Sequence, residues 1–334
     1  MKVRTSAPSR AGLAGNPSDG YGGRALAVAI TGFAAQATIE PASRVEIRSV
    51  RDGRLHHDSL SSLEERVSTE PGSPHRLAIA CCRRFLYEAP EREWLDRAPL
   101  PHEGFLLQYE TDIPERVGLA GSSALAVTIL RALALRYGAT IPEEDLPTLA
   151  LEVETRELGI HGGLMDRVAQ VLGGVTYMDL SDSLLSATGR GRYEQLPTNR
   201  LPALFVAWHP GMAAGSEHVH NRLRERVAKG DPQADAILKD LAGLADEARQ
   251  VLVAGSPEQL APLMDANFEL RARLVDVGDG NRRLVETGRQ IGAGVKQAGS
   301  GGAVVGAFDG DPSRLESLRL AYEQIGARFL VPRF

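Results

Sequence analysis

The chain has 334 residues, of which 43% are apolar and 24% charged, and its formal net charge is −5. This composition is typical of a globular protein with two domains of about 150 residues each. No stretch is strongly basic, which argues against a nucleic-acid partner, and no apolar run reaches the roughly 18 residues of a membrane-spanning helix. The N-terminus lacks the apolar core of a secretory signal, and the adjacent Cys81 and Cys82 form no disulfide or metal-binding pattern, so we expect a cytoplasmic protein.

Residues 5–23 are crowded with glycine, proline, serine, Asn and Asp, and an apolar run follows them at once. This composition is typical of a loop, and a disordered N-terminal tail is the plain alternative. Arg10, Asn16 and Asp19 lie in this segment, directly before a core strand. We therefore favour a polar loop with a functional role.

Hydrophobic periodicity and turn residues predict a mixed α/β chain. The domain boundary is expected near residue 181, where helices begin to dominate, which gives domains at 1–180 and 181–334. Residues 51–73 are polar and have no clear pattern. Strands are expected at 24–39, 44–50, 104–109, 175–180, 203–208, 304–308 and 327–331. Helices are expected at 75–88, 124–137, 146–158, 166–172, 216–229, 234–254, 258–276, 282–291 and 313–325.

The stretch Gly118-Leu-Ala-Gly-Ser-Ser-Ala124 joins a strand to a long helix. Its glycines allow a tight turn that aims several N–H groups at an anion, and Ser122 and Ser123 are suitable N-cap residues. A helix N-terminus binds phosphate, and a hydroxyl there can ligate the Mg²⁺ of a nucleotide. No Lys-Ser or Lys-Thr follows the glycines, so the loop is not a Walker A motif. A structural turn with a capping serine stays open.

Two more glycine-rich stretches carry polar residues of interest. In residues 159–174, paired glycines precede Asp166, which opens a helix and is either a functional carboxylate or a simple helix cap. Glu154, twelve residues earlier, lies on a helix whose other glutamates indicate a solvated face. In residues 294–303, glycines suggest close approach to a ligand or to another backbone.

Residues 5–23, 114–126 and 294–303, in this order, resemble the three motifs of the GHMP kinases, the family of galactokinase, homoserine kinase and mevalonate kinase, over roughly residues 5–310. Gly-Leu-Ala-Gly-Ser-Ser-Ala and the segments 166–174, 219–226 and 267–273 resemble the glucuronokinase branch most closely. The resemblance implies an N-terminal domain like a ribosomal protein and a ferredoxin-like C-terminal domain, with the active site in the cleft between them. It also implies ATP and Mg²⁺ as cofactors.

Roles follow from the resemblance residue by residue. Asp166 matches the catalytic aspartate and Arg10 an arginine near the phosphoryl acceptor, while Ser123 and Glu154 match the magnesium ligands. The nucleotide-binding residues implied are Gly118, Leu119, Ala120, Gly121, Ser122, Ser123 and Ala124. The substrate-binding residues implied are Arg10, Asn16, Asp19, Gly163, Asp166, Gly301 and Arg271. Asn16 and Pro17 stand where galactokinases have Glu-His, which argues against galactose.

We therefore expect an ATP-dependent kinase of a small sugar or sugar acid, with glucuronate to glucuronate 1-phosphate as the first choice. Arginine suits a uronate carboxylate, and Arg167, Arg222, Arg271 and Arg273 are candidates, each with a solvated surface arginine as its alternative. Another acceptor (a heptose phosphate, another hexose or mevalonate) and a non-catalytic nucleotide- or sugar-binding sensor stay open. No partner beyond the small molecule is expected, and the protein is a monomer or a homodimer. The sequence leaves open whether Asp166 removes a proton or orients the hydroxyl, and whether residues 51–73 border the nucleotide.

Overall fold

The structure is a computed structural model that describes residues 1–51, 53–57, 73–95, 104–212 and 217–334. Its contacts divide the chain into two compact units. Unit 1 contains Met1–Ser9, Phe33–Ile113 and Gly121–Gly162, and unit 2 contains Arg10–Gly32, Pro114–Ala120 and Gly163–Phe334. Because both units are discontinuous in sequence, this grouping does not test the domain boundary expected near residue 181, which stays a prediction. Most of residues 51–73, for which the sequence leaves a contact with the nucleotide open, lie outside the described residues.

Two long paired strands, β1 (Val3–Ala14) and β2 (Arg24–Ala42), contribute residues to both units. The prediction of a polar loop from residue 5 is wrong up to residue 14, because this segment is the strand β1. Its small residues have low β propensity, but pairing with β2 buries Ala7, Ala11 and Leu13 completely, and such burial outweighs local preference. The turn itself is short and ends in η1 (Ser18–Gly20).

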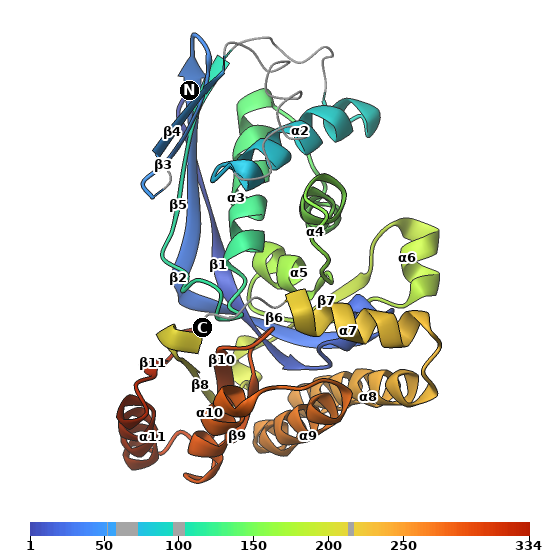
Figure 1. The fold of residues 1–334 in the computed structure, drawn as a ribbon, viewed down its shortest axis with the longest axis vertical. Helices are drawn as coiled ribbons and strands as arrows, with labels where there is room; N and C mark the ends of the chain where they lie inside the picture. The colour runs from blue at the N-terminus through green and yellow to red at the C-terminus, as the bar shows by residue number, and fades with distance from the viewer. Residues whose placement is uncertain (52, 58–72, 96–103, 213–216) are drawn as a thin grey trace. The chain divides into compact units, whose positions relative to one another are not determined.

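In unit 1, the strands β3 (Val45–Ser49), β4 (Gly53–His57) and β5 (Gly104–Thr111) join the second half of β2. Their order is β4-β3-β5-β2, with β3 and β5 parallel and the other pairs antiparallel. Figure 1 shows helices α2, α3 and α4 together on one side of these strands. These helices and a π-helical turn are α2 (Arg76–Glu91), α3 (Gly121–Tyr137), α4 (Leu146–Glu152) and η2 (Val153–Glu157).

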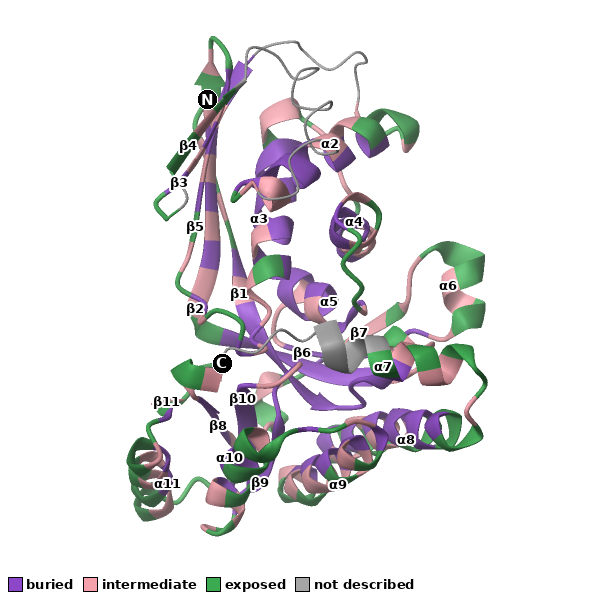
Figure 2. Ribbon diagram, in the orientation of Figure 1, coloured by how far each residue is buried: buried purple, intermediate pink, exposed green. Residues whose placement is uncertain are grey.

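Helix α3 is the core helix of unit 1. It is rich in alanine and leucine, and buried positions occur along most of its length (Figure 2). Its side chains pack against α2, α4 and β5. Gly138 follows the helix with φ +68°, a conformation that suits a glycine at the end of a helix. Helix α3 begins at Gly121, directly after the turn that Gly118 forms in the chain.

In unit 2, the first half of β2 pairs with β6 (Val175–Asp179), which pairs with β7 (Arg192–Leu196). Helix α5 (Met165–Leu172) precedes β6, and α6 (Asp182–Thr188) follows it. The sequence patterns do not predict α6 or β7. Both are short and have at most one buried residue each, so neither carries the hydrophobic periodicity on which prediction depends.

A second sheet of unit 2 has the strand order β11-β8-β10-β9, with every neighbouring pair antiparallel. The chain passes from β8 through helices to β9 and β10, and then through α11 to β11. This β-α-β-β-α-β path is the predicted ferredoxin-like arrangement. The strands are β8 (Ala203–Trp208), β9 (Gly294–Gln297), β10 (Ala303–Phe308) and β11 (Arg328–Leu330). The helices are α7 (Glu217–Ala228), α8 (Pro232–Ala254), α9 (Leu260–Leu274), α10 (Asp279–Arg289) and α11 (Pro312–Gln324).

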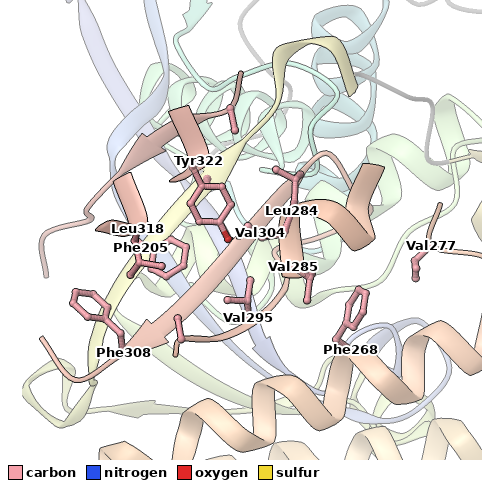
Figure 3. Close-up of a cluster of buried hydrophobic side chains, with 13 residues drawn as sticks. Phe205, Phe268, Val277, Leu284, Val285, Val295, Val304, Phe308, Leu318 and Tyr322 are labelled. Carbon is pink, nitrogen blue, oxygen red and sulfur yellow. Dashed lines mark hydrogen bonds between the residues drawn. The ribbon is translucent and has the colours of Figure 1, made fainter. Parts of the chain in front are cut away.

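The core of this sheet is aromatic. Figure 3 shows its buried side chains converging from the strands and from α9, α10 and α11. The ring of Phe205 lies 5.5 Å from that of Tyr322 and 5.1 Å from that of Phe329. The buried Tyr322 hydroxyl donates to Leu284 O at 2.8 Å, so its polar atom is satisfied inside the core. No helix among the described residues is long and apolar enough to cross a membrane.

Candidate active site

A buried arginine on β1 contacts three later segments of unit 2, at residues 118, 166 and 298. Arg10 Nε donates to Asp166 Oδ1 at 2.5 Å, in the first turn of α5. Its Nη1 donates to Gly118 O at 2.7 Å and to Ala298 O at 3.3 Å. The Arg10 side chain is 4% exposed and that of Asp166 is 24% exposed. Charge-assisted hydrogen bonds of this kind fix both partners, so Asp166 is oriented while it still reaches solvent.

A second carboxylate, Asp19, lies close to Asp166. Burial and the charge of Asp166 raise the pKa of Asp19 to about 6, although Arg10 and an amide hydrogen bond from Met165 oppose the shift. A Cβ atom at Gly163 would lie 2.1 Å from Asp19 Oδ2. A side chain at position 163 would therefore displace this carboxylate, which explains why the turn before α5 has a glycine there.

Three further cations interact with the charge of Asp19, and all three are buried: Arg167, Arg271 and Lys296. Burial lowers the pKa of both Arg167 and Arg271 to about 10, which leaves them charged at neutral pH. Arg271 Nη2 donates to Ser300 O at 3.4 Å, and its Nε has no hydrogen-bond partner among the described residues. With Arg10, four described cations of unit 2 lie near two carboxylates, so the cluster carries an excess of positive charge.

Lys296 on β9 contacts both the end of β1 and the segment after it. Its Nζ donates to Gly12 O at 2.7 Å, to Asn16 Oδ1 at 2.6 Å and to Gln297 O at 2.9 Å. Burial and the neighbouring arginines lower the pKa of Lys296. Three oxygen acceptors nevertheless require three N–H groups, which only the ammonium form has, so we assign the charged form.

Asn267 on α9 holds the same segment through its backbone. Its Oδ1 accepts from Gly15 N at 2.7 Å and its Nδ2 donates to Asn16 O at 3.2 Å. The Asn267 side chain is completely buried. The predicted substrate residue Asn16 is therefore held by two buried polar side chains, and Asp19 follows it by three residues. Sequence reasoning did not assign a role to Asn267 or to Lys296.

The glycine loop and the third glycine-rich segment pack backbone against backbone. Gly118 has φ +76°, and a Cβ atom there would lie 2.8 Å from Gly301 O. A Cβ atom at Gly299 would lie 2.2 Å from Gly118 O. Because any side chain at these positions would clash, the glycines permit the close approach that the sequence suggested. Leu119 is buried beside Ala120, whose carbonyl accepts from Gln170 Nε2 at 2.7 Å.

Unit 1 holds the start of helix α3 and a glutamate. Ser122 Oγ donates to Glu154 Oε1 at 2.8 Å. Glu154 is buried in the π-helical turn η2, and such turns are frequent at functional sites. Ser123 and Ala124 are buried in the first turn of α3. The predicted ligand Ser123 therefore has a neighbour, Ser122, whose hydroxyl contacts the second predicted ligand.

The candidate arginines fall into two groups. Arg222 and Arg273 are exposed, as expected for solvated surface residues, whereas Arg167 and Arg271 are buried beside Asp19. Arg271 follows Asn267 by one helical turn, so both residues lie on the same face of α9. This i, i+4 spacing of polar residues in an otherwise amphipathic helix is the signal that sequence reasoning could have used for Asn267.

Comparison with known proteins agrees with these motifs. The sequence model for the GHMP kinases N terminal domain matches residues 77–174. Glucuronokinase 1 of Arabidopsis thaliana is 34% identical over 321 residues, which cover 93% of this chain and 86% of that protein. Probable glucuronokinase 2 of the same plant is 36% identical over 318 residues, covering 93% and 85% respectively.

Solved structures show the same fold. The galactokinase of Lactococcus lactis, solved in complex with galactose, superimposes with a TM-score of 0.81 at 18% identity, covering 100% of this chain and 94% of that one. The predicted mixed α/β GHMP kinase fold is therefore confirmed. With relatives above 30% identity along most of its length and three motifs in the family order, the chain belongs to the GHMP kinase family.

Proposed function

We propose that the protein is an ATP- and Mg²⁺-dependent kinase that phosphorylates a sugar acid, with glucuronate converted to glucuronate 1-phosphate. The observation that carries this proposal is the cluster in unit 2, where a partly exposed carboxylate, Asp166, lies among buried cations. Phosphoryl transfer needs positioning and charge neutralisation more than covalent chemistry. The similarity to two plant glucuronokinases favours a uronate over other acceptors.

In this reaction Asp166 accepts the proton of the acceptor hydroxyl, or orients that hydroxyl. The acceptor oxygen forms a bond to the γ-phosphorus as the bond from that phosphorus to the bridging oxygen of ADP breaks, and ADP leaves. Arg10 holds Asp166 and contributes positive charge near the transferred group. The N–H groups of the Gly118–Ala124 segment would bind the nucleotide phosphates at the start of α3.

The residues of unit 1 fit a magnesium ion. The distance between Ser122 Oγ and Glu154 Oε1 is 2.8 Å, and both are the hard oxygen donors that Mg²⁺ prefers. We propose that Glu154 holds the ion with a serine hydroxyl of α3, either Ser122 or the predicted Ser123. When bound, Mg²⁺ neutralises charge on the nucleotide phosphates.

The excess positive charge near Asp19 supports an anionic acceptor. We propose that Arg271 binds the uronate carboxylate, because its buried Nε has no protein partner among the described residues and a guanidinium pairs well with a carboxylate. Arg271→Ala should raise the glucuronate KM by about tenfold or more and leave the ATP KM within twofold. Arg273→Ala, two positions along the same helix and exposed, is the matched control. Equal effects of the two variants on the glucuronate KM would refute this role.

A panel of acceptors tests the reaction itself. ADP release would be measured with ATP, Mg²⁺ and glucuronate, galacturonate, a heptose phosphate, galactose or mevalonate. We expect turnover on glucuronate to exceed that on every other acceptor. Preference for another acceptor would support kinase activity but refute the assignment of a uronate as the acceptor. ATP binding without turnover on any acceptor would favour the alternative of a non-catalytic nucleotide- or sugar-binding sensor.

A further inference from the structure

The phosphate-binding segment contains a backbone conformation that needs support. Ala120 has φ +64°, in the left-handed region that residues with a Cβ atom rarely adopt. Gly118, two residues earlier, has φ +76°, which a glycine adopts without strain. An alanine in this conformation persists only when its surroundings hold it there.

A buried glutamine provides that support within unit 2. Gln170 Nε2 donates to Ala120 O at 2.7 Å, and Gln170 is 1% exposed. Gln170 follows Asp166 by one turn of α5, so the two side chains leave the same face of the helix. Arg10 donates to Gly118 O at 2.7 Å. Two carbonyl groups of the loop are therefore held by side chains, and both holding groups are fixed to the helix that carries Asp166.

The direction of each carbonyl fixes the direction of an N–H group. In a trans peptide the C=O and the following N–H point in opposite directions. Holding Gly118 O therefore turns the Leu119 N–H away from Arg10, and holding Ala120 O turns the Gly121 N–H away from Gln170. Successive N–H groups that point out of such a turn form an anion-binding concavity. The hydrogen bond from Gln170 thus aims a donor of this concavity.

We propose that Gln170 is a positioning residue for nucleotide binding: by holding Ala120 O it aims the Gly121 N–H at a nucleotide phosphate. This inference rests on the proposed kinase function. Gln170 touches neither substrate in this account and acts only through the loop. Its loss should therefore weaken ATP and ADP binding and leave acceptor binding unchanged.

The test compares Gln170→Met with Gln195→Met. Methionine nearly matches glutamine in volume and lacks the donor. Gln195 Nε2 donates to Leu172 O, at the other end of α5, at 2.6 Å, so the control removes the same kind of bond from the same helix away from the loop. The dissociation constant of MgADP would be measured by calorimetry, and KM for ATP and for glucuronate by ADP release. Thermal unfolding would be recorded for both variants.

We expect Gln170→Met to weaken MgADP binding and raise the ATP KM by about tenfold, with the acceptor KM within twofold and Gln195→Met like the wild type. Binding of MgADP by Gln170→Met within twofold of the wild type would overturn the role of Gln170. A tenfold loss of MgADP binding in Gln195→Met as well would also overturn the role of Gln170. If Gln170→Met does not fold, Gln170→Asn, whose amide is one methylene too short, takes its place with the same expectations. A wild-type protein that binds no nucleotide would refute the proposed function, and this inference with it.

Discussion

Replacing Asp19 by asparagine should stabilise the protein at neutral pH while weakening its function. Asp19 is partly buried beside Asp166, and its pKa is raised from 3.8 to about 6. A carboxyl group with a raised pKa in the fold binds its proton more tightly when folded than when unfolded. The wild-type free energy of unfolding therefore falls as the pH rises from about 3.8 to about 6. Asparagine is neutral at every pH and removes this loss.

The magnitude follows from the two pKa values. Below about pH 3.5 the ionisation of Asp19 costs the fold almost nothing. Its cost is about 2 kcal/mol at pH 5 and about 3 kcal/mol at pH 7, where it levels off. Because Asp19 is not fully shielded from solvent, screening makes these values the upper end of the expected range. Asp19→Asn should therefore be more stable than the wild type by a margin that grows between pH 4 and pH 7.

The assay is urea unfolding of both proteins at several pH values between 4 and 8, followed by tryptophan fluorescence. Asp240→Asn, an exposed position on α8, provides the same change of charge without burial. The acceptor KM of Asp19→Asn should rise, because the resemblance assigns Asp19 to substrate binding. A stability difference that is independent of pH, or one that Asp240→Asn reproduces, would refute the assigned burial and coupling to Asp166.

Other variants test the remaining roles. Asp166→Asn should lower turnover by about a hundredfold or more with MgADP binding within threefold, and near-wild-type turnover would remove it from the catalytic role. Glu154→Gln should raise the Mg²⁺ concentration needed for half-maximal activity, and an unchanged Mg²⁺ titration would reject the site. If Ser122→Ala raises this concentration too and Ser123→Ala does not, Ser122 is the hydroxyl ligand. Lys296→Met should lower the free energy of unfolding by about 3 kcal/mol or more, because it leaves buried oxygens without donors, and an unchanged value from urea unfolding would contradict the three hydrogen bonds.

Much of the fold could be predicted because most elements carry strong local signals. The periodic patterns of α3 and α8 and the apolar run of β8 identify elements whose burial the structure confirms. The strand β1 was missed because its alanines, serines and glycine indicate a loop, and only pairing with β2 makes it a strand. The strand β9 was missed for the same reason: Gly294-Val-Lys-Gln has little β propensity, yet it is buried beside β10.

The site could be predicted only in part. The glycine motifs and Asp166 are local patterns with a chemical meaning, so a sequence can reveal them. The contacts of Lys296 with Gly12 and Asn16 join residues that are about 280 positions apart, and no local pattern predicts such a pair. Gln170 is similar, because its spacing from Asp166 is visible in the sequence but its bond to Ala120 is not.

We propose that the protein phosphorylates a sugar acid and recognises its carboxylate. The most direct measurement is kcat/KM for ADP release with glucuronate and with glucose, which share the anomeric hydroxyl and differ at C6 in carboxylate against hydroxymethyl. A site that holds the carboxylate with a buried cation predicts a preference for glucuronate of about a hundredfold, since a charged hydrogen-bonded contact contributes about 3 kcal/mol. Equal values for the two sugars, or no ADP release with glucuronate, would contradict this account.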